Sequence, residues 1–133
     1  MQKAVRPLAG VIFLLILWQG ASGAKAFSGQ DWAHGHSAQL LLFLSLSIAP
    51  ITIKAEFPKK TKVVPHASAL SILSIVTWSI GTYLMTDGGS IDWGWLHVLL
   101  ALVMSGHCFA LLLLAQPEVP VSDQEKKAEE WSY

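Results

Sequence analysis

Four apolar runs cover most of the chain, and short polar stretches separate them. The first run covers residues 8–18, and the other three cover about 37–53, 67–85 and 95–115. Each of the last three approaches the ~20 residues of helix that are needed to cross ~30 Å of hydrocarbon. The pattern predicts an all-α integral membrane protein, built as a bundle of transmembrane helices without a sizeable soluble domain.

The first apolar run has two interpretations. Lys3 and Arg6 precede it, and residues 24–26 (Ala-Lys-Ala) follow it. A basic start, a short apolar centre and an Ala-x-Ala exit are typical of a secretory signal peptide. Cleavage there leaves Phe27 as the first residue and three transmembrane helices. A retained leader instead adds a fourth helix, because the run and its small-residue extension nearly span the bilayer.

Charges in the loops predict the orientation of the bundle. The stretch 54–62 carries four lysines, whereas 86–92 carries two acids and no base. The positive-inside rule places the lysine-rich loop in the cytoplasm. The protein is expected in a bacterial inner membrane or another energy-transducing membrane. The predicted organisation is a signal peptide or first transmembrane helix over 1–26, a transmembrane bundle over 27–115 and a polar cytoplasmic tail over 116–133.

Composition narrows the classes of function. Hydrophobic residues make up 53% of the chain and charged residues 14%, against about a quarter charged in a soluble domain. Nine basic and nine acidic side chains cancel, so nucleic acid is not an expected partner. The chain has no Gly-rich phosphate loop, nucleophile elbow or His-Glu-x-x-His motif, so independent enzymatic activity is not expected. The single cysteine, Cys108, excludes an internal disulfide and is expected to be a packing residue.

The predicted topology sorts the five histidines into two layers. His34, His36 and His97 lie near the outer face, and His66 and His107 form an inner pair. His107 lies ten residues after His97, which is about 15 Å deeper along a helix. Ionisable groups inside a membrane are costly and usually face a bundle interior, a cofactor or a water path. The histidines therefore carry the functional predictions.

His107 is the deepest of these side chains and has three interpretations. A buried imidazole needs partners for its nitrogens, and Ser105, Ser74 or Thr77 could supply one across a helix interface. The ring could equally hold a cofactor, or it could pass protons. The sequence leaves these alternatives open.

The tripeptide His34-Gly35-His36 is a His-x-His motif on the predicted outer side. In an extended segment both imidazoles point the same way, which suits capture of copper or zinc, with His97 completing the predicted metal site. In a helix the two rings point about 200° apart, and only one of them can face inward. Gly35 favours a non-helical or fraying start to this segment.

Two histidines from neighbouring helices, with one pair near each membrane face, suit a b-type haem protein. Haem iron takes axial imidazoles from opposite sides, and the macrocycle needs an apolar slot beside small residues. Small residues that could give this space, or could serve close helix packing, are Gly81, Gly94, Gly106, Ala67, Ala69 and Ala101. His97 and His107 differ by about 80° around a helix axis, so one haem is expected rather than two.

The order of features over residues 33–114 resembles that of small cytochrome b561-like membrane proteins. These features are a histidine opening one helix, the loop Phe57-Pro58-Lys59-Lys60, His66 opening the next helix, Trp78 and Gly81 within it, and His97 and His107 in the last helix. The resemblance implies ligation of b-type haem and electron transfer across the membrane. It makes His36, His66, His97 and His107 the candidate ligands.

Three functions follow from these observations. The first is a haem-binding electron-transfer subunit, within or beside a respiratory or photosynthetic complex in the lipid bilayer. The second is a structural accessory subunit of such a larger membrane complex, because a short chain with almost no loops gains stability by burying its faces in an assembly. The third is handling of copper or zinc on the periplasmic side.

Overall fold

The described part of the chain forms four helices. The computed structural model describes residues 1–26, 32–87 and 91–116. Its helices are α1 (Gln2–Ala26), α2 (Trp32–Lys54), α3 (Lys60–Asp87) and α4 (Ile91–Leu114). The described part of the chain contains no strand, so the prediction of an all-α protein is confirmed. Phe27 and nearly all of the predicted tail lie outside the described residues.

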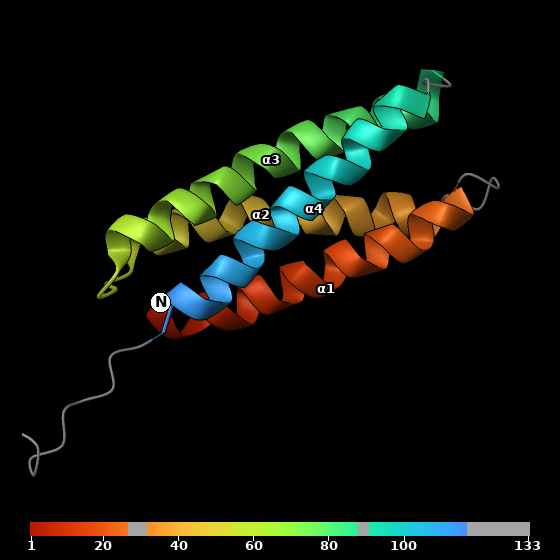
Figure 1. Ribbon diagram of the computed structural model, residues 1–133. Coiled ribbons are helices and arrows are strands. Elements are labelled where there is room, and N and C mark those ends of the chain that lie inside the picture. Colours follow the sequence, from red (N-terminus) through yellow and green to blue (C-terminus); the bar gives the residue numbers. More distant parts are fainter. Residues whose placement is uncertain (27–31, 88–90, 117–133) are drawn as a thin grey trace, which may run out of the picture.

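The helices pack as a closed four-membered bundle. Each consecutive pair of helices is in contact, and α1 also packs against α4. Short connections make neighbouring helices antiparallel, as Figure 1 shows. Two diagonals result from this arrangement, one between α1 and α3 and one between α2 and α4. Both helices of the second diagonal carry histidines.

One stripe of each helix fills the centre of the bundle. In α1 the stripe consists of Val5, Ala9, Ile12 and Ile16, all at most 5% exposed, and this spacing of four, three and four residues keeps them on one helix face. Cys108 is fully buried in the same core, which confirms its prediction as a packing residue.

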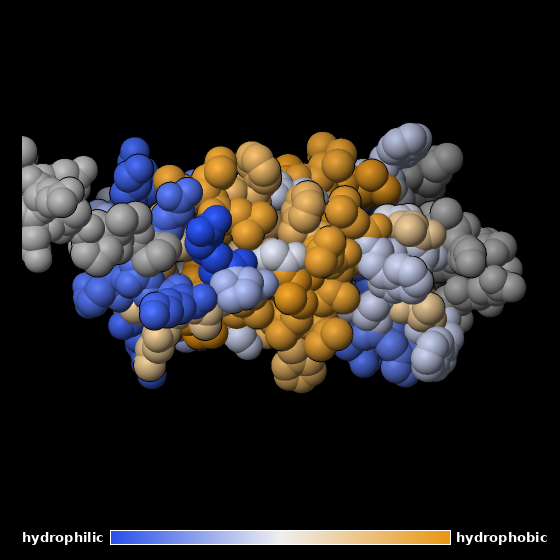
Figure 2. All heavy atoms as spheres, turned by 90° about the horizontal axis from the view of Figure 1, so that it is seen from below, coloured by the Kyte–Doolittle hydropathy of each residue, from blue (hydrophilic) through white to orange (hydrophobic). Residues whose placement is uncertain are grey.

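The outward faces of the helices are also apolar. Phe43 on α2 is 72% exposed, and Leu102 on α4 is 64% exposed. On the face drawn in Figure 2, apolar side chains form a band across the middle, and polar residues lie toward both ends. Helices that are apolar all round and remain exposed outside the bundle suit hydrocarbon better than water.

All four helices are long and apolar enough to cross a membrane. The candidate spans are Gln2–Gly23, Trp32–Lys54, Lys60–Met85 and Trp93–Leu114. The chain is therefore compatible with an integral membrane protein. The run interpreted as a leader forms the first of these spans, while its cleavage after residue 26 stays a prediction.

The helices begin earlier than the apolar runs that predicted them. α2 begins at Trp32 and α3 at Lys60, whereas the predicted apolar segments begin at 37 and 67. Polar and basic side chains occupy these additional turns, and long side chains of this kind can reach the membrane surface from a helix end. Because α2 is already helical at Gly35, the non-helical start predicted for this segment is wrong.

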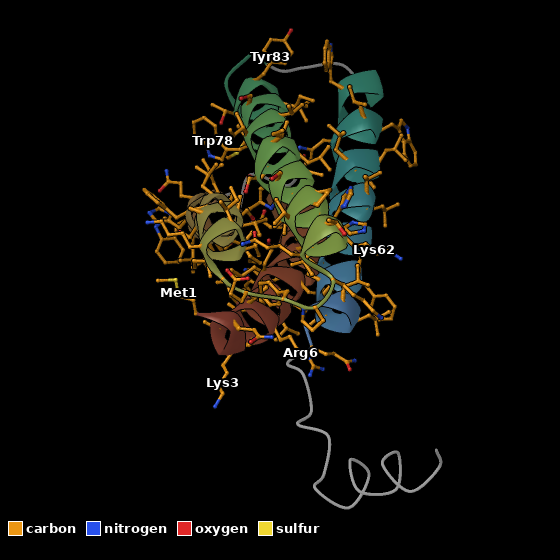
Figure 3. The ribbon with its side chains drawn as sticks, turned by 90° about the vertical axis from the view of Figure 1, so that its left-hand side faces the viewer. Met1, Lys3, Arg6, Lys62, Trp78 and Tyr83 are labelled. Atoms are coloured by element: carbon orange, nitrogen blue, oxygen red, sulfur yellow. The ribbon has the colours of Figure 1, made fainter. Side chains whose placement is uncertain are left out.

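The two ends of the bundle differ in charge. The start of α1, the connection from α2 to α3 and the end of α4 lie together, and we call this the basic end. Figure 3 shows Lys3 and Arg6 there, with Tyr83 at the opposite end. His66 and His107 lie in the half of the bundle nearer the basic end, and the other three histidines lie in the opposite half.

Candidate functional site

Four of the five histidines form two pairs. His34 on α2 and His97 on α4 have ring centroids 6.4 Å apart, with their planes tilted by 57°. His66 on α3 and His107 on α4 have ring centroids 5.1 Å apart. The first pair joins helices across a diagonal of the bundle, and the second joins neighbouring helices.

The His34–His97 pair lines a cavity in the half of the bundle opposite the basic end. The cavity has two adjoining parts of about 310 Å³ and 780 Å³. Both parts are lined by His34, His97, Gly81 and Ala101. Each volume lies in the range of ~300–1,000 Å³ typical of small-molecule and cofactor sites. We call the two parts together the histidine cavity.

The two parts of the histidine cavity reach different helices. The smaller part extends between α2 and α3, where Trp78 forms part of its wall. The larger part extends between α1 and α4, where Leu17 and Leu102 line it. Both leucines are more than half exposed, so this part of the cavity opens toward the outer surface of the bundle. The lining is predominantly apolar, as suits a hydrophobic ligand.

A glycine allows each ring of the His34–His97 pair to lie against a neighbouring helix. A methyl group added at Gly81 of α3 would lie 2.9 Å from Cε1 of His97. One added at Gly23 of α1 would lie 3.3 Å from Cε1 of His34. The first distance is too short for carbon atoms, so the observed position of His97 requires glycine at position 81. Among the small residues named from the sequence, Gly81, Gly94 and Ala101 line the cavity, and Ala67 packs in the core.

Polar atoms on the cavity wall are only partly satisfied. Nδ1 of His97 and Oγ1 of Thr77 are buried and make no hydrogen bond to any described residue. Leaving a buried polar atom unpaired costs about 1–3 kcal/mol. Both residues line the smaller part of the cavity, so these two groups carry unused hydrogen-bonding capacity beside it.

His34 is held more firmly, by side chains of α1. The hydroxyl of Ser22 lies 3.2 Å from Nδ1 of His34. The amide nitrogen of Gln19 donates to the backbone oxygen of His34 at 3.0 Å and to the hydroxyl of Ser37 at 2.7 Å. Both Gln19 and Ser22 are buried. The first turn of α2 is therefore fixed to the last turns of α1.

The predicted inner pair is in direct contact. Nδ1 of His66 lies 2.9 Å from Nδ1 of His107, which is a hydrogen-bond distance. One ring must donate and the other accept along this contact. The partners expected for His107 are engaged elsewhere or unpaired. Ser105 and Ser74 donate to carbonyl groups of their own helices, and the hydroxyl of Thr77 has no partner among the described residues.

His36 lies apart from both pairs. Its Nδ1 is 2.9 Å from the carbonyl oxygen of Trp32, and its ring packs on the Trp32 ring at a centroid distance of 4.8 Å. The ring is exposed. The cause is helical geometry, because two positions along a helix turn a side chain by about 200° and only His34 faces inward.

The predicted copper or zinc site has no assembled geometry. Of His34, His36 and His97, only the first and third lie close together. Across residues 1–26, 32–87 and 91–116, no three metal-binding side chains are grouped to hold an ion. Metal capture therefore stays a prediction that the arrangement of these rings does not support.

Three residues of the site were not identified from the sequence. Gln19, Ser22 and Gly23 fall in the segment interpreted as a leader, where small and polar residues are expected near a cleavage site. The available signal was the spacing of Gln19 and Ser22, which places two polar side chains on one helix face after a long apolar run.

Comparison of the chain with family models, with curated proteins and with solved structures finds no match. The resemblance to cytochrome b561-like proteins therefore stays a prediction.

Proposed function

We propose that the protein is a small electron-transfer protein of the membrane that binds one b-type haem in the histidine cavity, with His34 and His97 as axial ligands. The supporting observation is the His34–His97 pair itself: two imidazoles on diagonally opposed helices, with ring centroids 6.4 Å apart, that both line an apolar cavity. A haem held there supplies a site for one-electron transfer.

The spacing of the rings fits this group. Metal–imidazole bonds of about 2 Å, with the ring radius added on each side, put the centroids of two opposed axial imidazoles roughly 6 Å apart. The α2–α4 diagonal carries the two ligands, and glycines on the other diagonal, Gly23 and Gly81, keep the flanking helices free of bulky side chains beside them.

The His66–His107 pair does not fit an iron between its facing nitrogens. Opposed axial nitrogens lie about 4 Å apart, whereas the two Nδ1 atoms are 2.9 Å apart and hydrogen-bonded. We therefore assign this pair to the contact between α3 and α4. The proposal keeps the single haem expected from the sequence, and it replaces His36 with His34 as a ligand.

The absorption spectrum of the purified protein tests the proposal. Expressed with haem available and purified in mild detergent, the wild-type protein is expected to show a Soret band. On reduction it is expected to show the sharp visible bands of low-spin iron with two axial histidines. The proposal is falsified if no Soret absorption accompanies the folded protein.

The orientation of the bundle is part of the proposal. The four lysines of residues 54–62, in and beside the α2–α3 connection, favour a cytoplasmic position for the basic end, which puts the histidine cavity near the outer face. In a Cys108→Ala background, a cysteine at Ser90 is expected to react with an impermeant thiol reagent added outside intact cells. A cysteine at Thr61 is expected to react only after lysis. The opposite labelling pattern reverses the proposed orientation.

A further inference from the structure

The hydroxyl of Ser22 has three neighbours and a single hydrogen atom. Its oxygen lies 2.8 Å from the backbone oxygen of Trp18, 3.4 Å from that of Gln19 and 3.2 Å from Nδ1 of His34. Carbonyl oxygens only accept hydrogen bonds. The hydrogen of Ser22 is therefore donated to Trp18, the shortest of these contacts.

That assignment decides which nitrogen of His34 carries a hydrogen. With its own hydrogen committed to Trp18, the Ser22 oxygen can bond to His34 only as an acceptor. Nδ1 of His34 must then be the donor, and in a neutral imidazole the other nitrogen, Nε2, has a free lone pair. This is the form in which histidine ligates a metal, with the remaining ring N–H bonded to a neighbouring group that fixes the ring orientation.

Gln19 fixes the backbone that carries this ring. Ser37 donates its hydroxyl hydrogen to the carbonyl of Ala33 at 2.6 Å, so it accepts the hydrogen bond from Gln19. The second bond of Gln19 goes to the backbone oxygen of His34 itself. A methyl group added at Gly23 would lie 3.3 Å from Cε1 and 3.6 Å from Nδ1 of His34, so α1 lies beside the edge of the ring that carries Nδ1.

We infer that Ser22 and Gln19 are positioning residues, which set the tautomer and place of His34, and that α1 is consequently a wall of the site in the mature protein. The segment that has the pattern of a leader thus becomes part of the functional bundle. The tautomer and the retention of α1 do not require haem. Only their consequence for ligation rests on the proposed function.

Nitrogen NMR of the haem-free full-length protein tests the tautomer. With ¹⁵N-labelled histidine, protonated and bare ring nitrogens give well-separated signals, and a His34→Gln variant identifies those of His34. At a pH where the ring is neutral, wild type is expected to show a protonated Nδ1. Ser22→Ala is expected to shift the population toward the Nε2-protonated form, and Ser22→Thr, which keeps the hydroxyl, to restore the wild-type signals.

A matched control separates this effect from a general change in helix packing. Ser47 donates to the carbonyl of Phe43 at 2.8 Å, the same bond along a helix but on an exposed face and without a histidine. Ser47→Ala is expected to leave the His34 signals unchanged. A wild-type His34 protonated on Nε2, or an unchanged tautomer in Ser22→Ala, overturns the inference.

The mass of the mature chain tests the retention of α1. Protein purified from membranes through a C-terminal tag is expected to include residues 2–26, and a mass that begins at Phe27 overturns this part of the inference. These results are independent of the haem spectrum. A protonated Nδ1 without any Soret band overturns the proposed function and leaves the positioning role standing. With haem bound, Ser22→Ala is expected to weaken its binding by about 10–100-fold, and Ser22→Thr to restore it.

Discussion

Replacing either His34 or His97 with alanine is expected to abolish the low-spin haem spectrum, while His36→Ala and His107→Leu keep it. Removal of one axial ligand leaves the iron with a single imidazole. His36 is exposed and turned away from the cavity. His107 is hydrogen-bonded to His66 and is not among the residues that line the histidine cavity. The measurement is the reduced-minus-oxidised difference spectrum of each variant at equal protein concentration.

Free imidazole provides the control for misfolding in this series. An alanine at position 34 or 97 leaves space for a ring in the cavity, so added imidazole is expected to restore the low-spin bands of a folded variant. His107→Leu is expected to cost only about 1 kcal/mol through the lost interhelical hydrogen bond. If His107→Leu loses the spectrum while His34→Ala and His97→Ala retain it, the ligands belong to the other pair and the assignment made here is wrong.

Enlarging Gly81 is expected to weaken haem binding although this residue has no ligating atom. The added methyl group of Gly81→Ala would lie 2.9 Å from Cε1 of His97, so the ring must move out of its place. Overpacking of this kind typically costs about 1–3 kcal/mol, equivalent to a roughly 5- to 150-fold loss of affinity. Titration of the wild-type and Gly81→Ala apoproteins with haem measures this loss of affinity.

Two other glycines complete this comparison. Gly23→Ala places its methyl group 3.3 Å from His34, and Gly106→Ala meets nothing within 4 Å. The expected order of affinity loss is Gly81→Ala first, Gly23→Ala second, and no loss for Gly106→Ala. Alanine also stabilises a helix by up to about 1 kcal/mol relative to glycine, so Gly106→Ala is expected to unfold at a slightly higher temperature. Equal haem affinity in all three variants contradicts the proposed position of the ligand.

The sequence by itself determined the helices, their suitability for a membrane and the depth of each histidine. Depth follows from counting residues, because a helix rises by a constant ~1.5 Å per residue. Counting was enough to predict that His66 and His107 lie at one level, and they are in contact. It also predicted that His34 and His97 share the other level, where they are the two rings of the histidine cavity.

Only the tertiary structure decided which face of each helix turns inward. The buried face of a helix can be predicted from its sequence when the helix has a single apolar stripe. These helices are apolar all round, and exposed residues such as Phe43 and Leu102 are as hydrophobic as those in the core. The sequence therefore could not choose between His34 and His36. The choice depends on polar contacts between helices, with Gln19 and Ser22 of α1 bonding to the turn that carries His34. In the sequence, the predicted cleavage site after residue 26 lies between these two side chains and His34, so their contact with His34 could not be foreseen.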